Sequence, residues 1–479
     1  MAIEQTYNFD VTMMARHRSE SSLRESLSQI VGAERVHLDI SRRDELAWDA
    51  LSEGRLHPLK TPPRALPLCV VEPISTAETQ EIVRLANREK VPIVPYGGGS
   101  GLMGGALSTK PNIVIDLRRM SQIIQIDGES RMVHVQAGTV LEAVDQALTA
   151  AGFILGHDPW TVPVATVGGA ISTNSVGYRA GLYGSMGEQV LGLEAVLANG
   201  EILRTRSVPK SSVGINLNAL LIGGEGCFGI ITEATIRIFP KPAARSLHAI
   251  RFDSFESGFN AIQELFQQRL RPALLDFGDG EGEDENAGLL YLAFEGNRKL
   301  VETEARLAIA SCTHRGGVEL PRSEAEEFWE GRHSIARQFV KNRRQRRERG
   351  RDGIFRDWIH VALPASKVLP FRSAALQVIK SHGVQLQESG LWVQPELFSM
   401  RLGADRREMP DAQLALEETV DELLRLVQKF GGSMEYTHGV GVKLAPLMAE
   451  EHGYGLELMR QIKRVLDPNN IMNPGKLGL

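Results

Sequence analysis

The segment at residues 94–120, VPYGGGSGLMGGALSTKPNIVIDLRRM, decides the fold because a glycine-rich loop in it joins two apolar runs. Five glycines fall within residues 97–104, directly after the first run. Glycine leaves backbone amides accessible, so such a loop can hold a phosphate or pyrophosphate. The dinucleotide fingerprint that Gly99, Gly101 and Gly104 formally match requires a helix that opens at the glycines. A Pro-containing linker and a β-rich run follow instead, which predicts a strand–loop–strand arrangement that holds a flavin or nucleotide.

Length and composition are those of a globular protein with more than one domain. A chain of 479 residues exceeds one ordinary core, so we expect two or three domains. Its 42% hydrophobic and 24% charged content is typical of soluble proteins. A net charge of −5 offers no general attraction to nucleic acid or to an anionic membrane.

The cysteines and the N-terminal sequence bear on the compartment. Cys69, Cys227 and Cys312 lie far apart, which argues against a disulfide framework or a thiolate metal site. The first twenty residues hold no apolar signal core, and no run reaches the length of a membrane span. We therefore expect a cytoplasmic protein with no integral membrane segment and no nucleic-acid partner.

Capping signals and periodicity outline the first half of the chain. Ser75 and Glu78 form a capping box before an apolar stripe, which predicts a helix. Thr139 and Glu142 repeat this pattern before a helix that Gly152 closes. Strands are expected at residues 66–71, 91–95, 132–136, 189–197 and 230–239.

Two changes of character follow. Residues 159–178 carry no charge and are rich in Gly, Thr, Ser and Val. This segment is too polar for a core and too uncharged for a surface, so we expect it to pack against a large, partly apolar ligand. Beyond Pro242, helices and strands alternate with more charge, which indicates a second domain.

Six motifs in order resemble a known family. They are residues 96–105, 168–174, 183–184, 190–194, 199–202 and 224–231, and the tail at 467–476 resembles the closing signature of one branch. Together they look like the FAD-linked oxidase branch of the vanillyl-alcohol-oxidase/PCMH flavoproteins. This branch contains D-lactate dehydrogenases, D-2-hydroxyglutarate dehydrogenases, the glycolate oxidase flavin subunit and alkyl-dihydroxyacetonephosphate synthase.

The resemblance implies an α+β fold in four parts. Residues 1–63 would form N-terminal leader helices, and residues 64–243 a PCMH-type FAD-binding domain of two subdomains. Residues 244–437 would form a second α+β domain that caps the substrate. Residues 438–479 would return to the FAD-binding domain.

The resemblance also implies FAD as the cofactor. The amides of residues 97–101 would hold the pyrophosphate, and residues 226–231 would meet the adenine. Some members of the wider family attach FAD covalently through His or Cys, and because the loop here has neither, we expect non-covalent FAD. The predicted cofactor-binding residues are Tyr96, Gly97, Gly98, Gly99, Ser100, Gly101, Asp158, Pro159, Thr166, Gly168, Gly169, Ser172, Thr173, Gly226, Ile230, Ile231 and Asn473.

Three residues resemble the family's substrate groups. Arg332, in FWEGRH, would bind a substrate anion through its guanidinium group, unless it makes a salt bridge on a helix surface. His438, in YTHGVG, would handle the proton, with a buried structural role as the alternative. Tyr436 would either hydrogen-bond to the substrate or only pack. His333 and Arg401 are weaker candidates, and structural roles are favoured for both.

A metal is not expected. Metal-dependent members of the branch carry an H-x-G-D-G-N-x-H run and a Glu directly before the H-G-[IV]-G histidine. This chain has ESGLWVQPELFSMR at residues 388–401 and Thr437 before His438. The departure also weighs against a D-2-hydroxyglutarate or D-lactate dehydrogenase.

The basic run at residues 342–351, NRRQRRERGR, is the strongest charge feature. Its segment from Arg343 to Arg351 could line the entrance for an anionic substrate or dock an acidic electron acceptor. A solvated loop is the alternative. No aromatic residues interrupt the run, which argues against nucleic-acid binding.

The sequence as a whole predicts an FAD-dependent dehydrogenase or oxidase acting on CH–OH donors. It would oxidise a small, anionic, 2-hydroxy-acid-like substrate by hydride transfer to flavin N5. A quinone, an electron-transfer protein or oxygen would accept the electrons, and a homodimer is one assembly considered. The alternatives are a non-redox flavoenzyme of the ether-lipid-synthase kind and an FAD-binding subunit of a glycolate-oxidase-type complex. In that complex a partner would hold the iron–sulfur cluster, for which three cysteines are too few.

Overall fold

The computed structural model describes residues 22–279, 287–341 and 353–479. The predicted basic run from Arg343 to Arg351 lies outside the described residues, and so do the first 21 residues of the predicted leader. A helix covers residues 22–31 of that leader, and α2 (Ile40–Leu46) follows it.

A small sheet carries the glycine loop. Its strands are β1 (Val36–His37), β2 (Cys69–Val71), β3 (Ile93–Tyr96) and β4 (Ile113–Asp116), in the order β1–β2–β4–β3. Strands β2, β4 and β3 run parallel. The loop leaves β3 and returns as β4 with no helix between them, as the sequence predicted.

The two predicted helix caps have different outcomes. Helix α3 (Thr76–Glu89) begins at Ser75, whose hydroxyl accepts a hydrogen bond from the Glu78 amide at 3.2 Å. The predicted cap by Thr139 is wrong: α4 (Leu141–Ala150) begins one residue later, with no side-chain cap. The Leu141 amide donates instead to the carbonyl of Ala165 at 2.9 Å, so tertiary contacts replace the cap.

A second, antiparallel sheet adjoins the first. Its strand order is β5–β6–β10–β8–β9, with β7 paired to β10. The strands are β5 (Ile123–Asp127), β6 (Met132–Gln136), β7 (Phe153–Leu155), β8 (Val190–Val196), β9 (Ile202–Arg204) and β10 (Ile230–Pro240). The short helices α5 (Val167–Ser172), α6 (Ala180–Tyr183) and α7 (Met186–Gln189) precede β8.

The third sheet is antiparallel and belongs to the second half of the chain. Its order is β14–β11–β13–β12–β16–β17–β15. The strands are β11 (Ala244–Phe252), β12 (Leu274–Asp279), β13 (Gly288–Gly296), β14 (Val318–Glu319), β15 (Ile354–Ala362), β16 (Gln385–Trp392) and β17 (Leu397–Asp405). The helices are α8 (Phe255–Gln267), α9 (Arg298–His314), α10 (Arg322–Gly331), α11 (Ser334–Lys341), α13 (Ala365–Ser381) and α14 (Ala412–Lys429).

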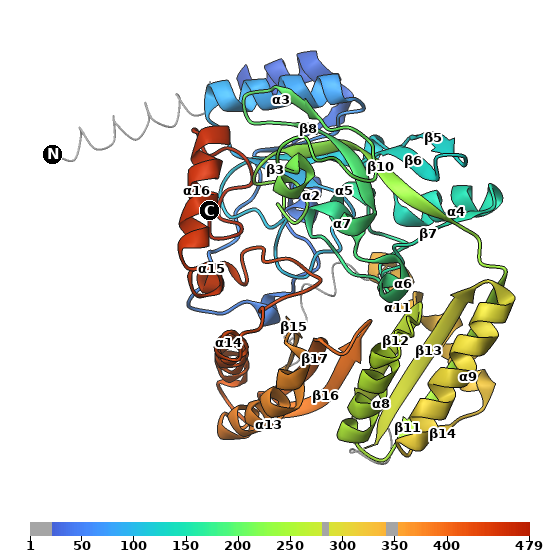
Figure 1. Cartoon of the computed structure of the whole chain (residues 1–479). Helices are drawn as coiled ribbons and strands as arrows, with labels where there is room; N and C mark the ends of the chain where they lie inside the picture. Colours follow the sequence, from blue (N-terminus) through green and yellow to red (C-terminus); the bar gives the residue numbers. More distant parts are fainter. Residues whose placement is uncertain (1–21, 280–286, 342–352) are drawn as a thin grey trace.

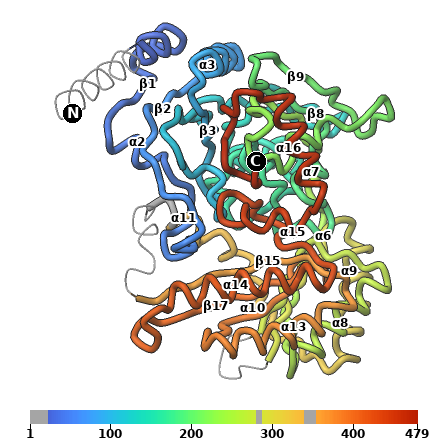
Figure 2. The backbone as a smooth tube through the Cα atoms, turned by 90° about the vertical axis from the view of Figure 1, so that its left-hand side faces the viewer, coloured from blue at the N-terminus to red at the C-terminus, as the bar shows by residue number. Residues whose placement is uncertain are grey.

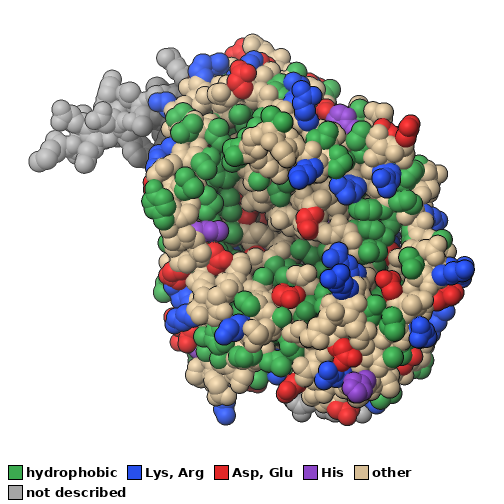
Figure 3. Space-filling view, viewed as in Figure 1, with side chains coloured by type: hydrophobic (Ala, Val, Ile, Leu, Met, Phe, Trp, Pro, Cys, Tyr) green, Lys and Arg blue, Asp and Glu red, His purple; other side chains and the backbone are tan. Residues whose placement is uncertain are grey.

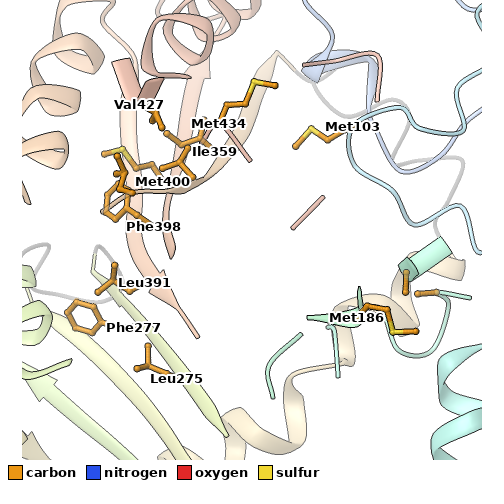
Figure 4. Packing of buried hydrophobic residues seen from close by; sticks show 14 of the residues in the cluster. Met103, Met186, Leu275, Phe277, Ile359, Leu391, Phe398, Met400, Val427 and Met434 are labelled. Carbon is orange, nitrogen blue, oxygen red and sulfur yellow. The ribbon is translucent and has the colours of Figure 1, made fainter. Parts of the chain in front are cut away.

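Long helices cover one face of the third sheet. Helices α8 and α9 pack on β11, whereas α13 packs on β16 and α14 on β15 (Figure 1). Phe277, Leu391 and Phe398 from this sheet belong to a buried cluster that also includes Met186 of α7 (Figure 4). This apolar core leaves the opposite face of the sheet to line a cavity.

The C-terminal segment returns to the first sheet (Figure 2). After α15 (Met448–His452) and α16 (Tyr454–Leu466), Met472 forms a parallel bridge with Ile93. The buried Lys463 ammonium donates to the carbonyls of Cys227 at 2.8 Å and Met472 at 2.7 Å. The fold is therefore α+β, whereas the exact domain boundaries stay predictions.

Candidate active site

Most residues predicted to hold FAD line one cavity, called here the cofactor slot. The uncharged segment at 159–178 supplies much of its wall, as expected for a segment that faces a ligand. The predicted residues in the lining are Tyr96, Gly97, Gly98, Gly99, Ser100, Gly101, Pro159, Thr166, Gly168, Gly169, Ser172, Thr173, Gly226, Ile230 and Ile231.

The amides of the glycine loop are available to a ligand. Within the described part of the chain, the backbone N–H groups of residues 97–101 donate no hydrogen bond. Two of these positions also have no room for a side chain: a Cβ at Gly97 would lie 2.3 Å from the Thr166 hydroxyl, and one at Gly98 would lie 2.1 Å from the Val164 carbonyl oxygen. Unpaired amides beside hydroxyl groups fit a pyrophosphate-bearing cofactor such as FAD.

Gly98→Ala should weaken FAD binding by about tenfold or more, because the Val164 backbone has to shift to admit the methyl group. Titration of the apoprotein with FAD, followed by quenching of flavin fluorescence, measures the dissociation constant. Gly455→Ala is the matched control, since a Cβ there meets only His452 at an ordinary 3.5 Å. Equal dissociation constants for both variants would show that the loop does not hold the cofactor.

Two predicted cofactor residues lie outside this lining. Asn473 is buried behind the slot, where its side-chain amide donates to the carbonyls of Gly105 at 2.8 Å and Glu225 at 2.6 Å. Asp158 faces a separate small cavity and accepts hydrogen bonds from Arg332 at 3.1 Å and His333 at 2.8 Å. Both residues therefore support neighbouring parts of the site.

A second cavity of about 850 Å³ adjoins the slot and is called here the substrate cavity. The two cavities share Leu102, Trp160 and His438, so a ligand in one meets a ligand in the other at these residues. The third sheet supplies one wall. Its charged and aromatic lining residues are Arg55, Trp160, Tyr178, Asp276, Tyr291, Phe328, Arg332, Phe355, Arg356, Trp358, His360, Glu388, Arg401 and His438.

Arg332 lines the substrate cavity, but its charge is partly balanced. Its Nη1 donates to the Trp329 carbonyl, and its guanidinium carbon lies 3.9 Å from the Trp329 ring centroid. Burial opposes ionisation of Asp158, but His333, Arg179 and Arg332 together hold the pKa of this carboxyl well below its usual range. The Asp158 carboxylate thus fixes the orientation of Arg332 and His333 together.

His438 stands beside two residues that sequence reasoning missed. Its Nδ1 lies 3.6 Å from Glu435 Oε1, and its ring centroid lies 4.5 Å from that of His360, edge-on. Glu435 Oε1 accepts the backbone amides of residues 436, 437 and 438. Burial opposes ionisation of Glu435, but His438 and these amides lower its pKa below the usual value. Burial lowers the pKa of His360 to about 3, so His360 is neutral.

Tyr436 does not line either cavity. Its ring packs edge-on to His360 at 5.8 Å, and its hydroxyl has no hydrogen-bond partner among the described residues. Burial raises its pKa well above the usual value. The geometry therefore gives Tyr436 a place behind His360.

Two family models match the chain. The model for the FAD binding domain matches residues 67–206, and the model for the C-terminal domain of FAD linked oxidases matches residues 241–477. The chain belongs to the FAD-linked oxidase family. This FAD-linked oxidase is a flavoprotein oxidoreductase whose cofactor is FAD, as the sequence predicted.

Relatives match over nearly the whole length. A D-lactate dehydrogenase of Archaeoglobus fulgidus is 31% identical over 444 residues, covering 90% of this chain and 95% of that protein. The glycolate oxidase subunit GlcD of Bacillus subtilis is 27% identical over 473 residues, covering 95% and 96%. The solved structure of an alkyldihydroxyacetonephosphate synthase has a TM-score of 0.78 at 19% identity, covering 95% of this chain and 86% of that one, which shows the shared fold.

The helices and the surface charges of the FAD-linked oxidase agree with the hydrophobic and charged content of its sequence. Among its described residues, none of the helices has the length and apolar character needed to cross a membrane. Acidic and basic side chains are interspersed over the face shown in Figure 3. Non-covalent attachment of FAD and the cytoplasmic location stay predictions.

Glu225 joins the cofactor slot to the turn after His438. Its carboxylate accepts the amides of Val440 at 2.6 Å and Gly441 at 2.9 Å. Burial raises the pKa of Glu225 to about 7, although these amides favour its charged form. Burial likewise lowers the pKa of the nearby Lys476 to about 8.

The contribution of Glu225 to the free energy of unfolding of the FAD-linked oxidase should fall as pH rises from about 5 to 8. The folded state holds the Glu225 proton up to about pH 7, whereas the unfolded state releases it near the usual value of 4.5. Glu225→Gln should remove this contribution, which is on the order of 3 kcal/mol. Denaturation with urea at several pH values, with FAD saturating, measures it. Glu302→Gln, on the exposed face of α9, is the control. If the free energy of unfolding of Glu225→Gln depends on pH in the same way as that of Glu302→Gln, the raised pKa of Glu225 is contradicted.

His360, Glu435 and His438 also form a group of metal-type ligands. One ligand atom from each lies within 4.8 Å of the others. Two imidazoles and a carboxylate are a set that Zn²⁺ accepts. The prediction of no metal rested on the sequence of residues 388–401 and on Thr437 before His438, and it stays a prediction.

Metal analysis of protein purified without chelator tests this prediction. We expect no bound transition metal, because Glu435 Oε1 is already engaged by three backbone amides. About one equivalent of zinc per chain, lost in His360→Ala, would overturn the prediction. His382→Ala, on a partly buried histidine of the second half, is the matched control.

Proposed function

We propose that this FAD-linked oxidase oxidises the alcohol carbon of an anionic 2-hydroxy acid. The observation that carries the proposal is the position of His438, which lines both the cofactor slot and the substrate cavity. When bound, FAD supplies a hydride acceptor at N5. The relatives named a D-lactate dehydrogenase and a glycolate oxidase subunit support this substrate class.

His438 acts as the base for the hydroxyl proton. Its buried Nδ1 faces Glu435, so Nε2 is the ring nitrogen that would accept the proton from a substrate in the cavity. Glu435 lies 3.6 Å away as a buried anion, and it stabilises the imidazolium that forms. The neutral His360 ring packs against His438 and limits its rotation.

Arg332 orients the substrate carboxylate. Asp158 and Trp329 hold its guanidinium group, so the group keeps one orientation toward the cavity. A pre-oriented cation loses little conformational entropy on binding an anion. The quinone, electron-transfer protein or oxygen that re-oxidises the flavin, and a homodimeric assembly, stay predictions.

An anaerobic visible spectrum tests the proposal. The purified protein is titrated with glycolate, D- and L-lactate, 2-hydroxyglutarate and neutral alcohols of matched size. Bleaching of the flavin band by hydroxy acids, and not by the neutral alcohols, is the expected result. A flavin band that no hydroxy acid bleaches would reject the proposal in favour of the non-redox alternative or the flavin-subunit alternative.

A further inference from the structure

The substrate cavity extends along the third sheet, away from His438. On β15, Arg356, Trp358 and His360 alternate with buried residues and line the cavity. His360 marks the end beside His438, at 4.5 Å between ring centroids. Because two residues along a strand advance about 7 Å, Trp358 lies about 7 Å farther from the base.

Two guanidinium groups contact Trp358. Arg401 of β17 lies opposite Trp358 in the strand register, and its Cζ is 5.8 Å from the ring centroid. Arg55 contacts the same ring at 5.7 Å. Arg55 is committed to Asp357, since its Nε donates to Oδ1 at 2.5 Å.

Arg401 forms no comparable ion pair among the described residues. Its Nε is buried, and among the residues that the structure describes it has no hydrogen-bond partner. Glu388 of β16 lies opposite Arg401 in the strand register. Arg401 lines the substrate cavity and forms no ion pair among the described residues, so an anionic ligand there would balance its charge.

We propose that Arg401 and Trp358 form a distal anion subsite of the substrate cavity. It binds an anionic oxygen group that the substrate carries several bonds away from the oxidised carbon. The inference rests on the proposed function, because it takes that carbon to lie beside His438. A carboxylate bonded directly to that carbon could not also reach a group about 7 Å along the sheet.

The size of the cavity agrees with this substrate class. Its volume of about 850 Å³ lies in the upper part of the range of about 300–1,000 Å³ that holds drug-sized ligands. Glycolate or lactate would leave most of this space and the Arg401 charge unused. The substrate is therefore a hydroxy acid with a remote carboxylate or phosphate group.

Binding of non-oxidisable acids to the FAD-loaded protein tests the subsite without turnover. Perturbation of the flavin spectrum gives dissociation constants for propionate, glutarate and 3-phosphonopropionate. Wild type should bind both two-headed acids more tightly than propionate. Arg401→Leu should weaken them by about 10- to 100-fold and leave propionate within about twofold, as expected for one charged hydrogen-bonding group. Tighter binding of glutarate would identify the remote group of the substrate as a carboxylate, and tighter binding of 3-phosphonopropionate would identify it as a phosphate.

Two further variants separate charge from structure. Arg401→Lys keeps the positive charge and should restore part of the affinity for the two-headed acids. Arg464→Leu removes an exposed arginine of α16, outside the cavity, and should change nothing. Equal weakening of all three acids in Arg401→Leu, or no weakening of any, would overturn the subsite. So would a wild type that binds propionate as tightly as glutarate.

The binding assay and the bleaching assay fail in different ways. If no hydroxy acid bleaches the flavin but Arg401→Leu still loses glutarate selectively, the proposed reaction is wrong and the subsite stands. If hydroxy acids bleach the flavin and Arg401→Leu binds glutarate like wild type, the reaction stands and the subsite is wrong.

Discussion

His438→Asn should slow reduction of the flavin by about 10²- to 10⁴-fold, the usual contribution of a general base. The His438 ring lines both cavities and has Glu435 beside it, so no other described imidazole occupies this position. Asparagine keeps the approximate size of the side chain, but its amide cannot accept the hydroxyl proton of the substrate near neutral pH. Anaerobic stopped-flow measurement of flavin bleaching gives the rate constant directly.

The control for this variant is His452→Asn, which removes an exposed histidine of α15. It should reduce the flavin at the wild-type rate. The FAD content and visible spectrum of His438→Asn should match those of wild type, which separates a chemical defect from a loss of cofactor. A rate constant within about threefold of wild type would give His438 a structural role instead.

Asp357→Asn should lower the free energy of unfolding by about 3–5 kcal/mol, the cost of breaking a buried ion pair. Asp357 Oδ1 accepts the Nε hydrogen bond of Arg55 at 2.5 Å, and Oδ2 pairs with the Lys443 ammonium. Lys443 also contacts Glu417 at 2.8 Å. The two cations hold the pKa of Asp357 below its usual range, despite burial that opposes ionisation. Asparagine would leave Arg55 and Lys443 buried with one remaining carboxyl group.

Asp405→Asn makes the same substitution at the end of β17, where the carboxylate pairs with the exposed Arg407. A solvent-exposed pair of this kind contributes little to stability, so this control should stay close to wild type. Urea denaturation with FAD saturating compares the two variants. A loss below about 1 kcal/mol in Asp357→Asn would mean that water or rearrangement compensates the two cations.

This buried network connects parts of the chain that sequence reasoning treated as separate. Arg55 comes from the leader, Asp357 from β15, Glu417 from α14 and Lys443 from the C-terminal segment. The helix cap at Ser75 was predictable because its hydrogen bond spans three residues. The pairing of Arg55 with Asp357 spans 302 residues and leaves no local pattern.

The residues around His438 show the same limit. His438 belongs to the short motif YTHGVG and was predicted from it. His360 becomes its neighbour only because β15 packs beside the turn that carries His438. The alternation of Arg356, Trp358 and His360 was a local signal for one face of a strand. The sequence does not show how β15 pairs with β17, so it could not predict that Arg401 lies opposite Trp358.

The sequence by itself determined the cofactor, the strand–loop–strand arrangement at the glycine loop and the family. These properties depend on residues close together in the chain, because a phosphate-binding loop needs consecutive amides without side chains. The tertiary structure alone decided which charges meet. Asp158 holds Arg332 across 174 residues, and Arg401 Nε remains without a hydrogen-bond partner among the described residues. Which distant charges pair depends on how the sheets pack, and the local sequence around a charged residue does not identify its partner.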